Sequence, residues 1–163
     1  MAPDDRTRYA LHEAGHAVAN VRFGFGCESL GIQPDAWHCK SGPMQPQHEW
    51  DAETRDRRMV VRLAGYAATI ILGRLDDSGA RAFAGADLDR ARRDLRAQHD
   101  GADDVEAELD AQLDQALVFV SEARNRLAIA ALAQELLKRT TLDGAEVEAI
   151  IARADGQPLQ PRG

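Results

Sequence analysis

The sequence predicts a mainly α-helical protein with a small β element of two or three strands near residues 28–42. Alanine and leucine dominate its apolar residues and only 5% of the chain is aromatic, a composition that favours helices over a β-sandwich. Several stretches also repeat apolar residues at spacings of three and four. With 163 residues the chain can bury roughly two-thirds of its unfolded surface. We expect one domain over residues 1–155 and a loose, disordered tail over residues 156–163.

The first helix is predicted to start next to Asp4 and Thr7, which are suitable N-terminal capping residues. Its apolar pattern continues to Val21 and stops at the glycine-rich residues 24–26. The next 24 residues, 27–50, lack helical periodicity. They are expected to hold a short strand at residues 29–33, a turn at 34–35, a second strand at 37–40 and a polar loop at 41–48.

The remainder of the chain is predicted to be helical. An apolar stripe from Met59 to Ile71 indicates a second helix that ends at Gly73. Next come a small-residue loop, a charged amphipathic helix, a long helix with room for a kink near residues 124–125, and a short last helix. These segments cover residues 78–85, 86–98, 105–138 and about 144–155. A capping box of Asp143 and Glu146 opens the last one.

Charge and cysteine content exclude several classes of function. A net charge of −7 and a pI near 5.2 argue against partners such as nucleic acid or an anionic membrane surface. No apolar run approaches the roughly 18–20 residues that a membrane span needs, and the first residues do not resemble a signal peptide. The two cysteines, Cys27 and Cys39, are expected to be reduced core thiols. A soluble cytoplasmic protein is therefore expected.

The first predicted helix carries the pattern H-E-x-x-H in residues 12–16. His12 and His16 are four residues apart, a rotation of about 400°, so both imidazoles project from nearly the same side of the helix. Two imidazole nitrogens about 2 Å from one ion suit Zn²⁺. The alternative is a pair of ordinary histidines on a helix.

Glu13 and Gly15 fit the same interpretation. Glu13 is rotated about 100° from His12, so it is placed to reach a zinc-bound water rather than the ion itself. It is the candidate general base, which would take a proton from that water as it attacks a carbonyl. Gly15 costs the helix about 1 kcal/mol relative to alanine. The close approach of another backbone segment would explain its presence.

A catalytic zinc site needs a third protein ligand. A metzincin would have glycine at position 19 and histidine at position 22, where this chain has Ala19 and Arg22, so that arrangement is excluded. Glu53 is a gluzincin-type candidate, although a helix-capping role is the alternative for it. The other histidines are isolated in the sequence, and we expect them to be solvated or hydrogen-bonded: His38, His48 and His99.

Asp87 is the preferred third ligand. It follows a flexible small-residue segment and is expected to open a helix, so its carboxylate can face inward. The small side chains of residues 84–86 would let the backbone come close to the ion. A plain N-cap is the alternative role for Asp87.

Four segments together resemble the peptidase domain of the FtsH family of metalloproteases. Residues 10–19, ALHEAGHAVA, are similar to the zinc-binding helix of that family, and residues 63–73 resemble its second peptidase helix. Residues 85–91, GADLDRA, resemble the segment that holds its third zinc ligand, and residues 125–144 resemble its C-terminal helices. The resemblance implies a Zn²⁺ site formed by His12, His16 and Asp87, with Glu13 as general base.

The resemblance also implies a substrate and an assembly. Residues 29–33 would be an edge strand that holds an extended peptide, so the expected partner is a peptide or an unfolded protein segment. The family assembles into rings, and the alanine-rich helical stripes of this chain permit a homo-oligomer. The sequence has no G-x-x-x-x-G-K-[ST] loop, so we expect proteolysis without ATP.

Three positions near the expected site depart from the family. Thr69 stands where the family usually has glutamate, Ala86 where it has asparagine, and Arg92 where it has threonine. The leading hypothesis is a soluble, cytoplasmic, ATP-independent zinc metallopeptidase. The alternative is a non-catalytic binding or regulatory module with a structural zinc, and a third hypothesis is a protein with neither metal nor activity.

Overall fold

The computed structural model describes residues 4–34, 36–99 and 102–156 of the chain. In these residues the fold is mainly helical with one small antiparallel sheet, as the sequence predicts. The elements are α1 (Asp5–Arg22), β1 (Cys27–Gln33), β2 (Ala36–Ser41), the 3-10 helix η1 (Gln47–Glu49), α2 (Ala52–Ile71), α3 (Asp77–Gln98), α4 (Ala102–Ser121), α5 (Ala123–Arg139), β3 (Thr141–Asp143) and α6 (Gly144–Asp155). Of the predicted tail, residues 157–163 lie outside the described residues.

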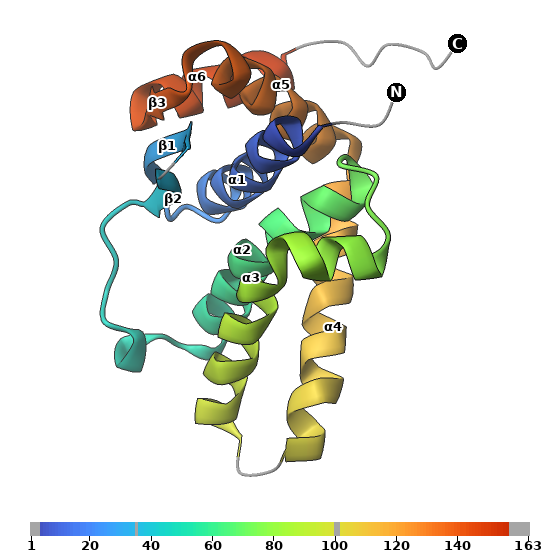
Figure 1. Cartoon of the computed structure of the whole chain (residues 1–163). Helices are drawn as coiled ribbons and strands as arrows, with labels where there is room; N and C mark the ends of the chain where they lie inside the picture. Colours follow the sequence, from blue (N-terminus) through green and yellow to red (C-terminus); the bar gives the residue numbers. More distant parts are fainter. Residues whose placement is uncertain (1–3, 35, 100–101, 157–163) are drawn as a thin grey trace.

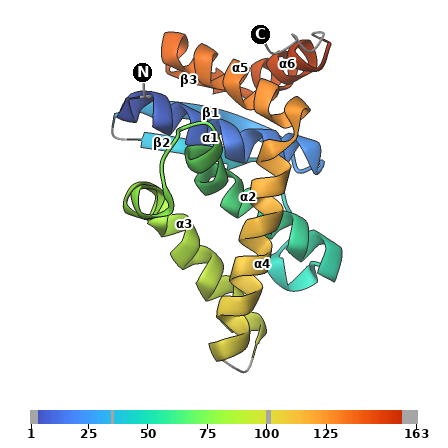
Figure 2. The same cartoon turned by 90° about the vertical axis from the view of Figure 1, so that its right-hand side faces the viewer.

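Helix α1 occupies the centre of the molecule. It packs between α2 and α5 and runs beside β1 and β2 (Figures 1 and 2). A Cβ atom added to Gly15 would lie only 2.6 Å from the carbonyl oxygen of Ala64 in α2. This contact confirms that a close backbone approach explains Gly15. Asp4 caps α1 as predicted, because its Oδ1 accepts a hydrogen bond of 2.8 Å from the amide of Thr7.

The sheet has the order β2-β1-β3, which corrects two expectations. The segment 29–33 belongs to the central strand and not to an edge, because β1 pairs with β2 on one side and with β3 on the other. The third strand comes from residues 141–143, far along the chain from residues 28–42. Three residues are too few to show strand alternation, so the sequence pattern could not reveal β3. The two edge strands of this sheet are β2 and β3.

Helix α3 replaces the expected loop at residues 78–85. The helix already begins at Asp77, because Asp76 caps it through a 2.7 Å hydrogen bond from the amide of Gly79 and the hydroxyl of Tyr66 contacts Asp77. A break does occur at Ala84, whose φ of −129° and ψ of 22° are not helical. The predicted helix 86–98 is therefore the second section of a kinked helix.

The predicted long helix 105–138 is two helices. Glu122 is extended, with φ of −59° and ψ of 131°, and separates α4 from α5. The side-chain amide of Asn125 donates a 2.8 Å hydrogen bond to the carbonyl of Phe119 at the end of α4. The kink expected near residues 124–125 is thus a complete break at Glu122, and Figure 2 shows the change of direction. The apolar spacing continues across the break because both helices bury one face, so the pattern does not show how sharp the change is.

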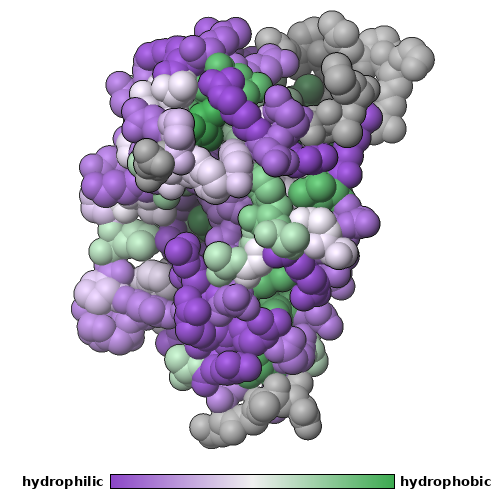
Figure 3. All heavy atoms as spheres, in the orientation of Figure 1, coloured by the Kyte–Doolittle hydropathy of each residue, from purple (hydrophilic) through white to green (hydrophobic). Residues whose placement is uncertain are grey.

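The last helix and the surface agree with the sequence. The capping box of Asp143 and Glu146 opens α6, and α6 buries Val147, Ile150 and Ile151. Hydrophilic residues cover most of the face in Figure 3, as the net charge of −7 suggests. Among the described helices, none has the length and apolar character to cross a membrane.

Candidate metal centre

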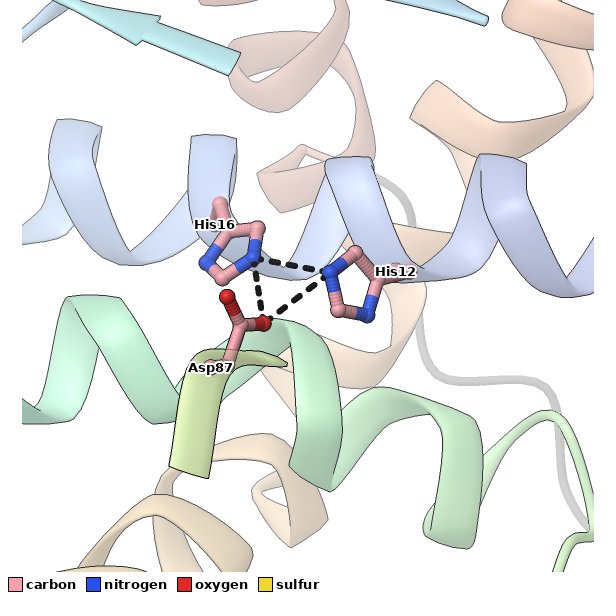
Figure 4. Close-up of side chains that lie close together, drawn as sticks. All are labelled: His12, His16 and Asp87. Carbon is pink, nitrogen blue, oxygen red and sulfur yellow. Dashed lines mark hydrogen bonds and ion pairs between the residues drawn. The ribbon is translucent and has the colours of Figure 1, made fainter. Parts of the chain in front are cut away.

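Helix α1 places His12 and His16 one turn apart on the face that is turned towards α3. Their Nε2 atoms are 3.1 Å apart and their rings stand nearly perpendicular, at 85°. Figure 4 shows both imidazoles pointing to a common point below α1. Each side chain is largely buried, with 12% and 14% exposed. The regular helix alone is enough to produce this pair.

Helix α3 brings Asp87 to the same point from far along the chain. One carboxylate oxygen, Oδ2, lies 3.0 Å from Nε2 of His12 and 3.2 Å from Nε2 of His16 (Figure 4). Asp87 belongs to the first turn after the break at Ala84, so the kink orients it. Its alternative role as an N-cap is wrong, because Asp76 caps α3.

The three atoms have the spacing of ligands around one metal ion. His12, His16 and Asp87 form a group that could hold a metal. In a tetrahedron with metal–ligand bonds of about 2.0–2.1 Å, ligand atoms are about 3.3 Å apart, close to the 3.0–3.2 Å observed here. Asp87 Oδ2 is buried without a properly oriented hydrogen bond. A cation between these atoms would satisfy it, so the donor set fits a divalent metal.

Helix α2 fixes the orientation of His16. The Nδ1 atom of His16 lies 2.8 Å from the carbonyl oxygen of Val61, which leaves Nε2 directed at the site. Gly65 makes room for the ring, because any Cβ there would overlap the imidazole of His16. Reasoning from the residues alone missed both contributions. Gly65 was nevertheless detectable, since a glycine inside a helix costs about 1 kcal/mol and calls for a reason.

His12 has no corresponding support. Its Nδ1 atom is buried and has no hydrogen-bond partner among the described residues. Thr69, one of the positions that depart from the FtsH pattern, does not supply the missing partner. Its hydroxyl donates a hydrogen bond of 2.7 Å to the carbonyl of Tyr66 instead. Histidines that bind metals usually donate their second nitrogen to a carboxylate or carbonyl. The two imidazoles of this site are therefore held unequally.

Burial and charge determine the protonation of the group. Burial by itself lowers the pKa of His16, but the adjacent Asp87 carboxylate and Glu13 outweigh it and raise that pKa to about 9. Burial also acts against the charged form of Asp87, but the two imidazoles hold the pKa of its carboxyl well below the usual range. In the absence of metal, a proton thus balances the carboxylate, and a metal would displace this proton.

Glu13 faces the same cavity as the three ligands. The cavity has a volume of about 440 Å³ and is lined by residues of α1, β2, α2 and α3. Glu13 is only 7% exposed, and its carboxylate makes no hydrogen bond or ion pair with another described residue. It is not one of the three clustered ligands. An uncommitted carboxylate beside the ligands is the arrangement that a general base requires.

The other candidate ligands lie elsewhere. Glu53 is exposed in the first turn of α2 and pairs with Arg57, while Asp51 caps that helix. His48 is exposed in η1, and His99 caps the end of α3. His38 lines the cavity, but its Nε2 contacts Ser29 Oγ at 3.2 Å.

Aromatic side chains cover one end of the cavity. The ring of Tyr9 packs on Trp37, at 3.4 Å between centroids, and on Phe83 at 4.3 Å. Packing is therefore the role of Tyr9. The two thiols are free and 4.0 Å apart, with Cys27 buried in the core as predicted. Cys39 differs from the prediction, because it is partly buried and lines the cavity.

No protein-family model matches this chain, and no curated protein is significantly similar to it.

Proposed function

We propose that this protein is an ATP-independent zinc metallopeptidase that hydrolyses peptide bonds in peptides or unfolded protein segments. The proposal rests above all on the juxtaposition of His12, His16 and Asp87, whose ligand atoms lie 3.0–3.2 Å apart. The FtsH-like sequence around these residues supports the choice of zinc. So does the donor set of two imidazoles and one carboxylate.

Each side chain has a distinct role in this proposal. His12, His16 and Asp87 would hold the ion, and Val61 and Gly65 keep the ring of His16 in place. A bound zinc ion supplies Lewis-acid polarisation of a carbonyl and lowers the pKa of water to about 7. Glu13 would accept a proton from the attacking water and pass it to the nitrogen of the leaving amine. Its burial keeps this proton transfer away from bulk solvent.

The substrate would bind along β2. No strand in the described part of the chain pairs with the outer edge of β2. Successive β2 residues, Trp37, His38 and Cys39, all line the cavity although their side chains alternate between the two faces of the sheet. The edge itself therefore faces the cavity. An extended peptide could add to it through backbone hydrogen bonds.

The experiment compares the zinc-loaded protein with its Glu13→Gln variant on casein, an unstructured substrate. We expect cleavage by the parent protein and a loss of at least about a hundredfold in the variant, because general-base catalysis contributes 10²–10⁴-fold. Zinc content should be the same in both, since Glu13 is not a ligand. Equal turnover by the two proteins would refute the proposal.

One observation favours a second candidate, a non-catalytic module with structural zinc. Helix α3 packs on α2 and α4 and has little contact with α1 beyond the metal ligands and the Tyr9–Phe83 pair. A metal would thus fasten α3 to α1. In that case chelation would lower the melting temperature strongly while casein stays intact.

A further inference from the structure

We propose that Arg58 forms a carboxylate-binding subsite in the cavity of the metal centre. Its ligand would be a carboxylate of the peptide substrate, either an acidic side chain close to the cleaved bond or the C-terminal carboxylate. The inference rests on the proposed function, because it assigns a substrate class to the same cavity.

Arg58 is a half-buried cation without an acidic partner. Its Nη1 donates to Asn20 Oδ1 at 3.0 Å, and both terminal nitrogens lie near Ser41 Oγ, at 3.4 Å and 3.5 Å. Its Nε is buried and has no hydrogen-bond partner among the described residues, and no described acid forms an ion pair with it. Arg90 also lines the cavity without forming an ion pair, but it is exposed, whereas Arg58 combines an unpaired charge with a buried Nε.

The guanidinium is also held in place. It lies over the ring of Phe25, 4.8 Å from the centroid, and 5.7 Å from the ring of Trp50. These rings restrict its movement. Burial and the neighbouring Arg62 lower the pKa of Arg58, so a nearby negative charge would relieve an unfavourable environment.

The position of Arg58 relates the subsite to the metal ligands. Asn20, which holds the guanidinium, follows His16 by four residues on the same face of α1, or about 6 Å along the helix axis. An extended peptide advances about 3.3 Å per residue. A carboxylate bound by Arg58 would therefore belong to a residue roughly two positions from the cleaved bond.

The chemistry of the group specifies its ligand. A guanidinium offers five N–H donors in a planar fork that matches a carboxylate, and only some of them are used by Asn20 and Ser41. A glutamine in the substrate would leave the charge unpaired, and a lysine would repel it. We expect about a tenfold preference for an acidic residue over its amide.

Arg62 provides a matched control. It lies one turn after Arg58 on α2 and also lines the cavity, but Asp94 already pairs with it at 2.9 Å. Its charge is therefore compensated, whereas that of Arg58 is not. Arg62→Gln should leave the preference for acidic substrates unchanged.

The test uses fluorogenic peptides that carry Glu, Gln or Lys at each position within three residues of the cleaved bond. For the parent protein, kcat/KM should be about tenfold higher with Glu than with Gln at one of these positions. Arg58→Gln should abolish this difference, and Arg58→Lys should keep part of it. An undiminished preference in Arg58→Gln, or none in the parent protein, would overturn the subsite.

A binding experiment separates this inference from the proposed function. Zinc-loaded Glu13→Gln is titrated with the same peptides, each as a free acid and as a C-terminal amide, and the combined fluorescence of Trp37 in the cavity wall and Trp50 beside Arg58 reports binding. Loss of binding on amidation would identify the terminal carboxylate, and loss on Glu→Gln would identify the side chain. Binding that ignores both changes refutes the subsite even if casein is cleaved. Binding that follows either change supports it even if nothing is cleaved.

Discussion

The two halves of the metal centre differ in how the fold secures them. Helix α1 carries two ligands and is enclosed by α2, α5 and the sheet, and its last turn is bound to α6 through Arg22. Helix α3 carries the third ligand on a section that follows a break, and it has little contact with α1. The comparison suggests that α1 is prepared for metal before binding, while the metal itself completes the attachment of α3.

Removing a ligand should have the largest effect on either half. We expect His16→Ala and Asp87→Ala each to weaken zinc binding by more than about a hundredfold, above the 10–100-fold typical of residues that only support a ligand. Competition with a chromophoric chelator measures the affinity. His48→Ala, an exposed histidine outside the site, should bind zinc like the parent protein. Unchanged affinity in Asp87→Ala would show that α3 does not contribute a ligand.

Two glycine substitutions contrast the packing of the halves. In Gly65→Ala the new methyl group would overlap the ring of His16, so zinc affinity should fall by about 10–100-fold. Gly85, two residues before Asp87, has nothing within 4 Å of an added Cβ. The sequence-based expectation that it allows a close backbone approach is therefore wrong. Gly85→Ala should keep zinc affinity and stabilise the protein by about 0.4–1 kcal/mol. Thermal unfolding and metal competition check both. Equal zinc affinities of Gly65→Ala and Gly85→Ala would contradict the proposed difference in packing between the two halves.

The pH dependence of stability should change sign with metal. Without zinc, the pKa of His16 is raised from an ordinary 6.5 to about 9, so its stabilising contribution is complete below pH 6.5 and is lost as pH rises through about 9. With zinc, the same proton must leave, so affinity should rise by up to about tenfold per pH unit below pH 9. Melting temperatures of the apo and zinc-loaded protein between pH 6.5 and pH 9 should therefore diverge. Parallel curves would contradict the metal assignment.

Weakening the attachment of α1 to α6 should have the smallest effect, a small loss in the free energy of unfolding. Arg22 donates two hydrogen bonds, of 2.7 Å and 2.6 Å, to Asp155, which also binds Arg124. These arginines hold the pKa of Asp155 well below its usual range, so its contribution is present above about pH 4 and is lost in more acidic solution. Asp155→Asn should cost about 1 kcal/mol at pH 7 and flatten the acid side of the stability curve. Urea unfolding at pH 3 and pH 7 measures this, and zinc affinity should not change.

Local spacing was sufficient to predict the α1 half of the site. His12 and His16 meet because a helix places residues four apart on one side, and Asp4 and the capping box of Asp143 are equally local signals. For the α3 half, the small residues around Asp87 and the resemblance both favoured it as third ligand, but its contact with the histidines depends on how α3 packs on α2 and α4, which local spacing does not show. The kink at Ala84 and the break at Glu122 were missed or misplaced because apolar periodicity does not record a change of direction. Arg58 escaped notice because its unpaired charge is visible only in the folded molecule.

The short strand β3 has a consequence for how the chain reaches this structure. Leu30 of the central strand pairs with Leu142, about 110 residues later. The sheet therefore cannot be completed while the chain is still emerging from a ribosome with only its first helices made. Until β3 has been synthesised, one side of β1 stays open to pairing with another nascent chain, so chaperone protection would matter most at that stage of synthesis.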